Sequence, residues 1–242
     1  MRSPVRSMTK VAAFVSLASL AFLVEIGPRS GGGDDDVTSD SSPTTAVPVT
    51  APPETVAAAA PTTTTEPSQF GAPVTGEFRV VAGTTPPVGT GRLVTYRVEL
   101  ETGLTLADAA VAGVVDATLA DPRSWTAPGD VQLQRVDGDA DVVIRLATPP
   151  TVDRLCLPLR TNGVFSCHRH GSVNLNVVRW QQGAEGWSLP MTEYRAYMVN
   201  HELGHALGHG HVGCPGPGQP APVMLQQTKG LDGCLANAWP YP

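Results

Sequence analysis

Four of the six histidines of the chain lie within eleven residues, in the segment HELGHALGHGH from 201 to 211. On a helix, His201 and His205 lie one turn apart on the same face, about 6 Å from each other, so their imidazoles can bind one metal ion. His209 continues that face, but a rise of about 1.5 Å per residue places it about 12 Å along the axis from His201. Zn–N bonds of about 2.0 to 2.1 Å cannot span that distance. The third ligand must therefore come from chain that has turned back.

Gly208 supplies the turn, because glycine accepts the left-handed conformation with which helices commonly end. His211, three residues further on, is then the predicted third ligand. Glu202 lies about 100° round the helix from the first ligand, where its carboxylate can reach a water on the metal and accept a proton from it. The pattern predicts one catalytic Zn²⁺ and metal-assisted hydrolysis, and the simpler alternative is a histidine-rich chelating tract.

The spacing of these residues resembles H-E-x-x-H-x-x-G-x-x-H of the metzincin metallopeptidases, in which a Met-turn follows. The matching positions are His201, Glu202, His205, Gly208 and His211. HELGHALG is especially similar to the matrix-metalloprotease version of this helix. The resemblance implies a methionine beneath the metal, and Met224 in PAPVMLQQ is the candidate, with ordinary core packing as its alternative. Residues 92–242 also resemble an uncharacterised family of exported bacterial metzincin-like domains, in DPRSW, NHELGHALGHGHVGCPGPG and the WPYP ending.

The N-terminal residues 1–26 have the layout of an export signal, in which basic residues precede an apolar run from 11 to 24. The run is shorter than the roughly 20 residues of a spanning helix, yet no clean A-x-A cleavage site follows it. We therefore expect an uncleaved anchor in the cell membrane with an extracytoplasmic catalytic domain, and a secreted protein is the alternative. Residues 27–69 are rich in Pro, Thr and Ala and are predicted to be a disordered linker. Residues 70–242 are long enough for one domain.

All four cysteines lie in the last 90 residues, at Cys156, Cys167, Cys214 and Cys234. An even number in an exported chain predicts disulfides. Sequence permits three pairings, and we favour Cys156–Cys167 and Cys214–Cys234 because each closes a local loop containing Gly or Pro. The cysteines lack the C-x-x-C spacing of zinc ligands. A pro-segment thiol that caps the zinc is excluded, because no cysteine precedes Cys156.

The order of expected elements predicts an α+β fold. A strand at 92–101 precedes a helix that a capping box of Thr105 and Asp108 opens and that runs through Ala120. VQLQRV and DVVIRLA are expected as two strands around the turn DGDAD, and a Pro/Gly-rich loop then carries the first cysteine pair. SVNLNVVRW (172–180) is a further strand, and MTEYRAYMVNHELGHALG is the zinc helix. The order resembles a metzincin domain with a mixed sheet, an N-terminal helix and a short C-terminal subdomain.

Two further sets of polar residues are candidates for a role in binding. Asn174 and Asn176 in VNLN could bond a substrate backbone, but strand alternation favours side chains that face solvent. His168 and His170 in SCHRHG could hold a structural zinc, as in a loop of this region in matrix metalloproteases. Two loop histidines without a nearby acidic residue are more often solvated, and this is our expectation. Gln226 stands where some metzincin families place a tyrosine, so no tyrosine ligand is indicated.

The sequence thus predicts a zinc metalloendopeptidase that acts on a peptide or protein substrate as a monomer. The net charge of −6 argues against nucleic acid as a partner. One alternative is a non-catalytic, zinc-stabilised module that binds a partner in the cell envelope. Another is an amidase that acts on a cell-wall crosslink. An intact Glu202 favours catalysis, because a purely structural site normally closes the fourth position of the metal with a protein ligand.

Overall fold

A computed structural model of the chain describes residues 75–242. The predicted anchor at 1–26 and linker at 27–69 lie outside the described residues. Within 75–242, no helix is both long and apolar enough to cross a membrane. The elements are β1 (Phe78–Val80), β2 (Val88–Gly89), β3 (Arg92–Glu101), α1 (Asp108–Ala120), β4 (Val131–Arg135), β5 (Val142–Ala147), α2 (Pro149–Cys156), β6 (Cys167–Arg169), β7 (Ser172–Asn176), α3 (Val177–Gln182) and α4 (Met191–Ala206).

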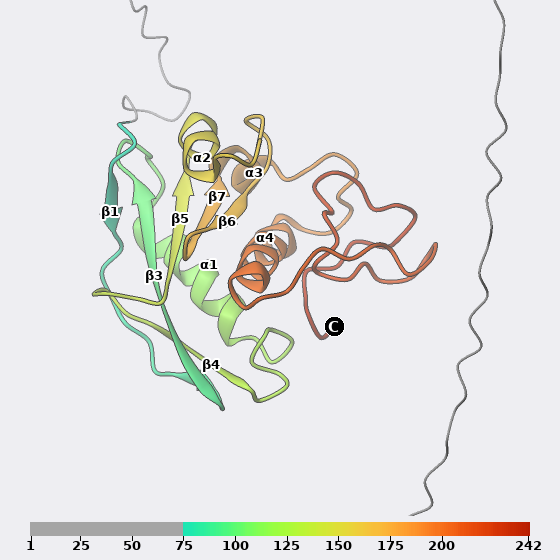
Figure 1. The fold of residues 1–242 in the computed structure, drawn as a ribbon, viewed down its shortest axis with the longest axis horizontal. Helices are drawn as coiled ribbons and strands as arrows, with labels where there is room; N and C mark the ends of the chain where they lie inside the picture. Colours follow the sequence, from blue (N-terminus) through green and yellow to red (C-terminus); the bar gives the residue numbers. More distant parts are fainter. Residues whose placement is uncertain (1–74) are drawn as a thin grey trace, which may run out of the picture. The chain divides into compact units, whose positions relative to one another are not determined.

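The described residues form one mixed sheet of seven strands with four helices, which confirms the prediction of a mixed sheet packed with helices. The strand order is β2-β4-β3-β5-β7-β6, and β1 pairs with β3 (Figure 1). The pairs β3–β4, β3–β5 and β5–β7 are parallel, whereas β1, β2 and β6 pair antiparallel with their neighbours. β6 is therefore an edge strand that runs against its neighbour.

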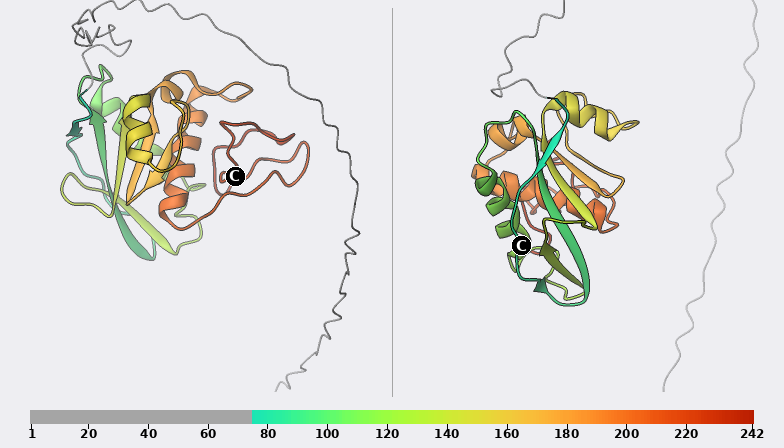
Figure 2. Two further views of the ribbon diagram at one scale, coloured as in Figure 1. Left: turned by 45° about the horizontal axis from the view of Figure 1, so that its top comes forward. Right: turned by 90° about the vertical axis from the view of Figure 1, so that its left-hand side faces the viewer.

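β3 extends over the predicted residues because its side chains alternate between the two faces of the sheet. Val94, Tyr96, Val98 and Leu100 are buried in the main core. α1 and α4 pack against this face and against each other (Figures 1 and 2). α2 packs on β6 and β7, where Ala147, Val152, Cys156 and Cys167 form a second, smaller core. The sheet thus holds α4 on one face and α2 on the other.

β4 and β5 do not form the hairpin that the turn DGDAD suggested. Both run parallel to β3 and lie on opposite sides of it, with Tyr96 paired to Arg135 on one side and Val142 on the other. The connection therefore crosses from one side of β3 to the other while the chain keeps its direction. Asp141 fixes the crossing, because its carboxylate accepts hydrogen bonds of 2.8 Å from both the backbone N–H and the hydroxyl of Thr95.

The structure begins α1 at Asp108, and its N-cap residue is Ala107, whose side chain makes no capping hydrogen bond. The Asp108 carboxylate accepts hydrogen bonds from the guanidinium of Arg79, the closer oxygen at 2.7 Å. This ion pair joins the start of α1 to β1.

Two short helices replace segments that were predicted as loop and strand. α2 begins at Pro149, where a proline costs little because the first N–H groups of a helix have no partner within it. The predicted strand 172–180 ends at Asn176, since the side-chain oxygen of Asn176 accepts from the N–H of Val178 at 2.9 Å and begins α3. Asparagine is a preferred N-cap residue, and this signal for a helix start was missed because the strand-like alternation of 172–180 was followed instead.

Candidate metal centre

α4 ends with the geometry that the sequence predicts for its last turn. Gly208 has φ +98°, in the left-handed region. The N–H of His209 donates to the carbonyl of Gly204 at 2.9 Å, and the N–H of Gly208 donates to the carbonyl of His205 at 3.1 Å. These two bonds form a Schellman motif, in which a glycine reverses the chain at the helix end. The chain that follows returns toward the face that carries the histidines.

His201, His205 and His211 are brought together by this reversal. One ligand atom from each lies within 4.8 Å of the others, and Nε2 of His205 lies 3.0 Å from Nε2 of His211. His209 lies outside the cluster, because its ring stacks on Trp125 with a centroid distance of 4.3 Å. The described residues hold no other group of three or more His, Cys, Asp or Glu with this geometry. The cluster can hold a metal ion.

The orientation of two of the rings is set by backbone carbonyls. Nδ1 of His201 lies 2.8 Å from the carbonyl oxygen of Val223, and Nδ1 of His205 lies 2.8 Å from that of His209. A carbonyl can only accept, so each Nδ1 carries the proton and each Nε2 keeps a free lone pair. Hydrogen bonds of this kind are usual behind metal-binding histidines.

The protonation state of the histidines also suits a cation. Burial lowers the pKa of His201 to about 3. Burial, with a smaller effect from the nearby His205, lowers the pKa of His211 below its ordinary value. Neutral imidazole is the form that binds a metal. Three histidine side chains form a donor set that fits Zn²⁺ and would leave one position of a tetrahedral ion open.

Glu202 is buried beside the cluster, and burial raises the pKa of its carboxyl to about 8. A hydrogen bond from the backbone N–H of His168 acts in the opposite direction. A bound cation would also favour the carboxylate, as any nearby positive charge does. The side chain can therefore hold or release a proton near neutral pH.

Met224 lies against the backbone of α4 between the first two histidines of the cluster. A Cβ placed on Gly204 would lie 2.5 Å from the sulfur of Met224 and 2.7 Å from Cζ2 of Trp125. Only glycine leaves room for both side chains. Gly204 was not singled out in the sequence, although a glycine in a helix interior, where it costs about 1 kcal/mol, is a detectable signal.

Buried polar residues fix this part of α4 to distant segments. Asn200, which precedes the first histidine of the cluster, accepts from the hydroxyl of Ser124 at 3.0 Å through its side-chain oxygen and from the indole N–H of Trp125 at 2.9 Å through its backbone carbonyl. Its amide donates to the carbonyl of Ala238 at 3.0 Å. Asn200 thus links α4 to the C-terminal segment next to the histidine cluster.

The described segment after α4 contains no further helix. Cys214 and Cys234 are bonded in it, as predicted, and they pack with Leu225, next to Met224. Gln227 and Asn237 hold its two sides together through hydrogen bonds of 2.7 and 3.0 Å. Side-chain hydrogen bonds and one disulfide therefore stabilise this segment in place of a helix or strand.

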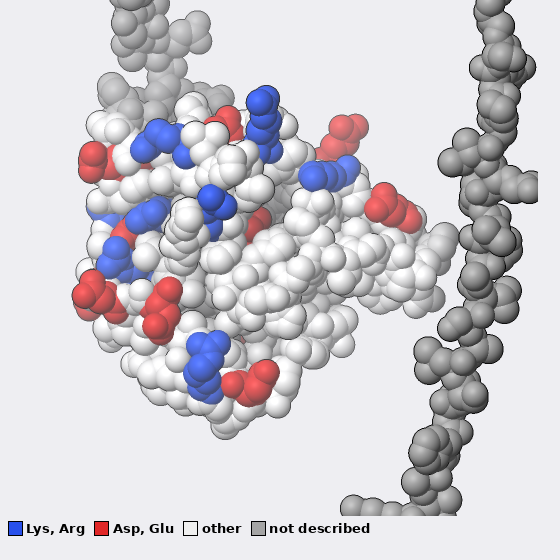
Figure 3. All heavy atoms as spheres, viewed as in Figure 1, with Lys and Arg blue, Asp and Glu red and all other residues white. Residues whose placement is uncertain are grey.

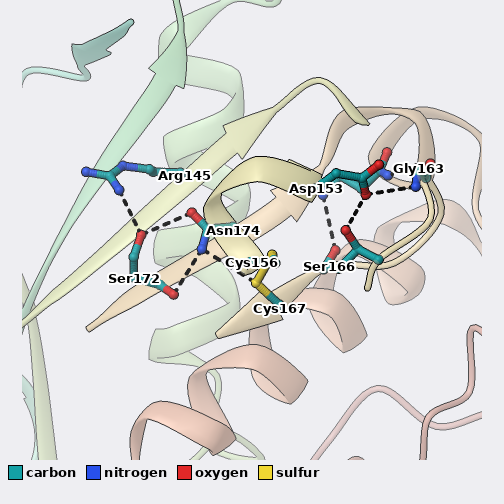
Figure 4. The surroundings of a disulfide bond; sticks show 10 residues. Arg145, Asp153, Cys156, Gly163, Ser166, Cys167, Ser172 and Asn174 are labelled. Atoms are coloured by element: carbon teal, nitrogen blue, oxygen red, sulfur yellow. Dashed lines mark hydrogen bonds between the residues drawn. A yellow bond between two sulfur atoms is a disulfide. The ribbon is translucent and has the colours of Figure 1, made fainter. Parts of the chain in front are cut away.

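A cavity of about 430 Å³ lies beside the cluster, and residues of the loop 157–166 form one of its walls. The predicted disulfide Cys156–Cys167 closes this loop at its base (Figure 4). Asp153 of α2 accepts from the N–H of Gly163 at 2.8 Å and also binds the hydroxyl of Thr161. The first disulfide, which the sequence linked to no site, thus positions a wall of the cavity.

Asn174 and Asn176 were predicted to face solvent, and this was wrong, because both are buried. The amide of Asn174 lies 3.7 Å from the sulfur of Cys167 (Figure 4). The amide of Asn176 donates to the carbonyl of Gly163 at 3.0 Å. They face α2 and its loop, since α2 covers this side of β7. They support the cavity wall from behind.

His168 and His170 differ in their surroundings. His168 lies in β6, is half-buried and lines the cavity, and burial lowers its pKa. His170 is exposed in the turn between β6 and β7. Neither belongs to the histidine cluster. The expectation of two solvated histidines therefore holds for His170 and was wrong for His168.

Searches of curated proteins and of solved structures found no match. The family described as "Protein of unknown function (DUF3152)" matches residues 64–242, which include all the described residues and the histidine cluster. The chain therefore belongs to the DUF3152 family.

Proposed function

We propose that the chain is a zinc-dependent hydrolase, and specifically a metalloendopeptidase of the metzincin type that acts outside the cytoplasmic membrane. The observation that carries the proposal is the meeting of His201, His205 and His211 beside the buried Glu202. A structural zinc normally has four protein ligands, whereas a catalytic zinc has three and an open position. The two disulfides support a location outside the cytoplasm.

Zn²⁺, when bound, lowers the pKa of a coordinated water toward about 7 and polarises the carbonyl of the bond to be cleaved. Glu202 accepts the proton of the attacking water at its carboxylate and then donates it to the leaving amine. The pKa of about 8 is that of Glu202 without an ion nearby, and a bound cation would favour the carboxylate form that accepts this proton.

The cavity supports an extended peptide as the substrate. β6 is the last strand in the hydrogen-bonded order, and its residues Cys167 and His168 line the cavity. An edge strand offers unpaired N–H and C=O groups, to which an extended peptide can add. Gln226 and Lys229, which follow Met224, line the same cavity. A bound peptide would lie between β6 and the residues that follow Met224.

The test is digestion of a peptide library by the zinc-loaded full chain, with and without a chelator. Glu202→Ala should keep its zinc and fold but lose hydrolysis by at least about 10²- to 10⁴-fold, the usual contribution of a general base. Glu185→Ala, at an exposed position outside the cavity, is the matched control and should cleave like the wild type. Zinc content and circular dichroism are measured for all three proteins.

The proposal is wrong if neither wild type nor Glu202→Ala cleaves any member of a broad panel of peptides and cell-wall fragments while both proteins have zinc bound. The chain would then be a zinc-stabilised binding module. Cleavage confined to cell-wall crosslinks would identify an amidase that uses the same residues.

A further inference from the structure

Two cavities flank Glu202, and basic residues line both of them. The larger one, of about 430 Å³, is lined by Arg160 and Lys229. The smaller one, of about 40 Å³, is lined by Arg179 and Lys229. Of the described residues that line either cavity, Glu202 is the only acid. Its carboxylate is assigned to proton transfer in the proposed function, so the basic residues are left without a negative partner.

None of these three cations forms an ion pair within the described part of the chain. Nζ of Lys229 lies 3.0 Å from the amide oxygen of Gln226 and 5.2 Å from the ring centroid of Phe165. Nη1 of Arg179 donates to the carbonyl of Gly183, and its Nε is buried without a hydrogen bond among the described residues. Arginines elsewhere in the domain do pair with carboxylates, namely Arg79, Arg97, Arg123, Arg135 and Arg145.

The charge at the cavities is local. Figure 3 shows basic and acidic side chains interspersed over the face it presents, with no broad basic surface. A ligand that the three cations attract would therefore be recognised at short range, within the cavities. Lys229 is already held by Gln226 and Phe165, and the Cys156–Cys167 disulfide closes the loop that carries Arg160. Groups that are held in place lose little entropy when a ligand binds.

We propose that these cations select substrates that present a carboxylate next to the bond to be cleaved. The inference rests on the proposed function, because it names the substrate class of the same site. A carboxylate accepts hydrogen bonds from both guanidinium and ammonium groups, and such charge-assisted bonds are stronger than neutral ones. The carboxylate can come from an Asp or Glu side chain or from the C-terminus of a peptide. A lysine or arginine at that position would be repelled.

The first experiment measures kcat/KM of the zinc-loaded full chain on matched peptides. Peptides with Glu beside the cleaved bond should be cleaved about tenfold faster than those with Gln, and the ratio should fall as salt rises, because partly exposed charges are screened. Lys229→Gln should reduce the ratio, and Lys229→Glu should reverse it in favour of Lys-containing peptides. Arg92→Gln, at an exposed position outside both cavities, is the control and should leave the ratio unchanged. Peptides with free and amidated C-termini distinguish the two sources of the carboxylate.

The second experiment separates this inference from the proposed function. Binding of the same fluorescent Glu and Gln peptides is measured with zinc-loaded Glu202→Gln, which should not turn them over, and with Glu202→Gln combined with Lys229→Gln. Tighter binding of the carboxylate peptides, lost in the double variant, would support the inference even if the wild type cleaves nothing. Equal cleavage and equal binding of Glu and Gln peptides would overturn the inference. Cleavage without any such preference would leave the proposed function standing.

Discussion

Gly204→Ala tests the contact between Met224 and α4. The added Cβ would lie 2.5 Å from the Met224 sulfur and 2.7 Å from Cζ2 of Trp125, more than about 1 Å inside normal contact distance. The methionine is flexible, but the indole is held by its hydrogen bond to the Asn200 carbonyl at 2.9 Å and by its stacking on His209. Overpacking of this kind costs about 1 to 3 kcal/mol, and alanine in a helix returns up to about 1 kcal/mol.

We therefore expect Gly204→Ala to lower the free energy of unfolding by about 1 to 2 kcal/mol, and Tm by about 2 to 8 °C for a domain of this size. Zinc affinity should fall about 10- to 100-fold, because a shifted Met224 also moves the Val223 carbonyl that orients His201. Calorimetry measures the first effect, and competition with a chelator of known affinity measures the second. Both are done with the full chain.

Gly113→Ala is the matched control, since Gly113 lies in α1, is exposed and has no atom within 4 Å of its added Cβ. It should raise the free energy of unfolding by up to about 1 kcal/mol and leave zinc affinity unchanged. If Gly204→Ala behaves like Gly113→Ala, the methionine and the indole do not press on the helix, and the reasoning is refuted. If stability falls while zinc affinity holds, Met224 packs the core without orienting the ligands.

Three further predictions concern the ligands, the disulfides and the buried carboxylate. His211→Ala should lose zinc, whereas His209→Ala should keep it nearly stoichiometrically by metal analysis, because the ring of His209 stacks away from the cluster. Cys214→Ser should weaken zinc retention and lower the free energy of unfolding by about 3 kcal/mol, which is the chain-entropy value for a loop of about 20 residues. Cys156→Ser should retain zinc better, and similar zinc loss in both variants would contradict this prediction. Glu101→Gln should cost about 3 kcal/mol in denaturant unfolding. The two oxygens of this fully buried side chain accept from the backbone N–H groups of Thr148 and Gly76, so a new amide nitrogen would face one of these donors in either orientation.

The parts of the fold that the sequence predicted depend on local signals. β3 alternates over ten residues and was placed correctly. The end of α4 at a left-handed Gly208 followed from helix geometry and the special conformation of glycine. The same geometry separated His211 from His209. Both disulfides are local, so loop closure alone favoured the observed pairing.

The parts that the sequence did not predict depend on contacts between distant residues. Nothing near DGDAD shows that β4 and β5 lie on opposite sides of β3, because that arrangement is decided by pairing with a strand about forty residues earlier. Asn174 and Asn176 alternate like solvent-facing residues, but α2 covers that face and buries them. The ion pair that joins Asp108 to Arg79 was not foreseen, because a window of sequence around Asp108 does not contain Arg79.

The metal centre and the C-terminal segment depend on each other. The Val223 carbonyl orients His201, and the Met224 carbonyl accepts from the N–H of Val212, next to the third histidine of the cluster. An ion bound by the cluster would therefore join α4 to a segment that has no helix or named strand within the described residues. The Cys214–Cys234 bond closes the same segment at a second point. The disulfide restricts the unfolded chain, and an ion would bind the folded chain alone, so both offset the entropy of ordering residues that lack the regular hydrogen bonds of a helix. An irregular segment can in this way hold His211 in place.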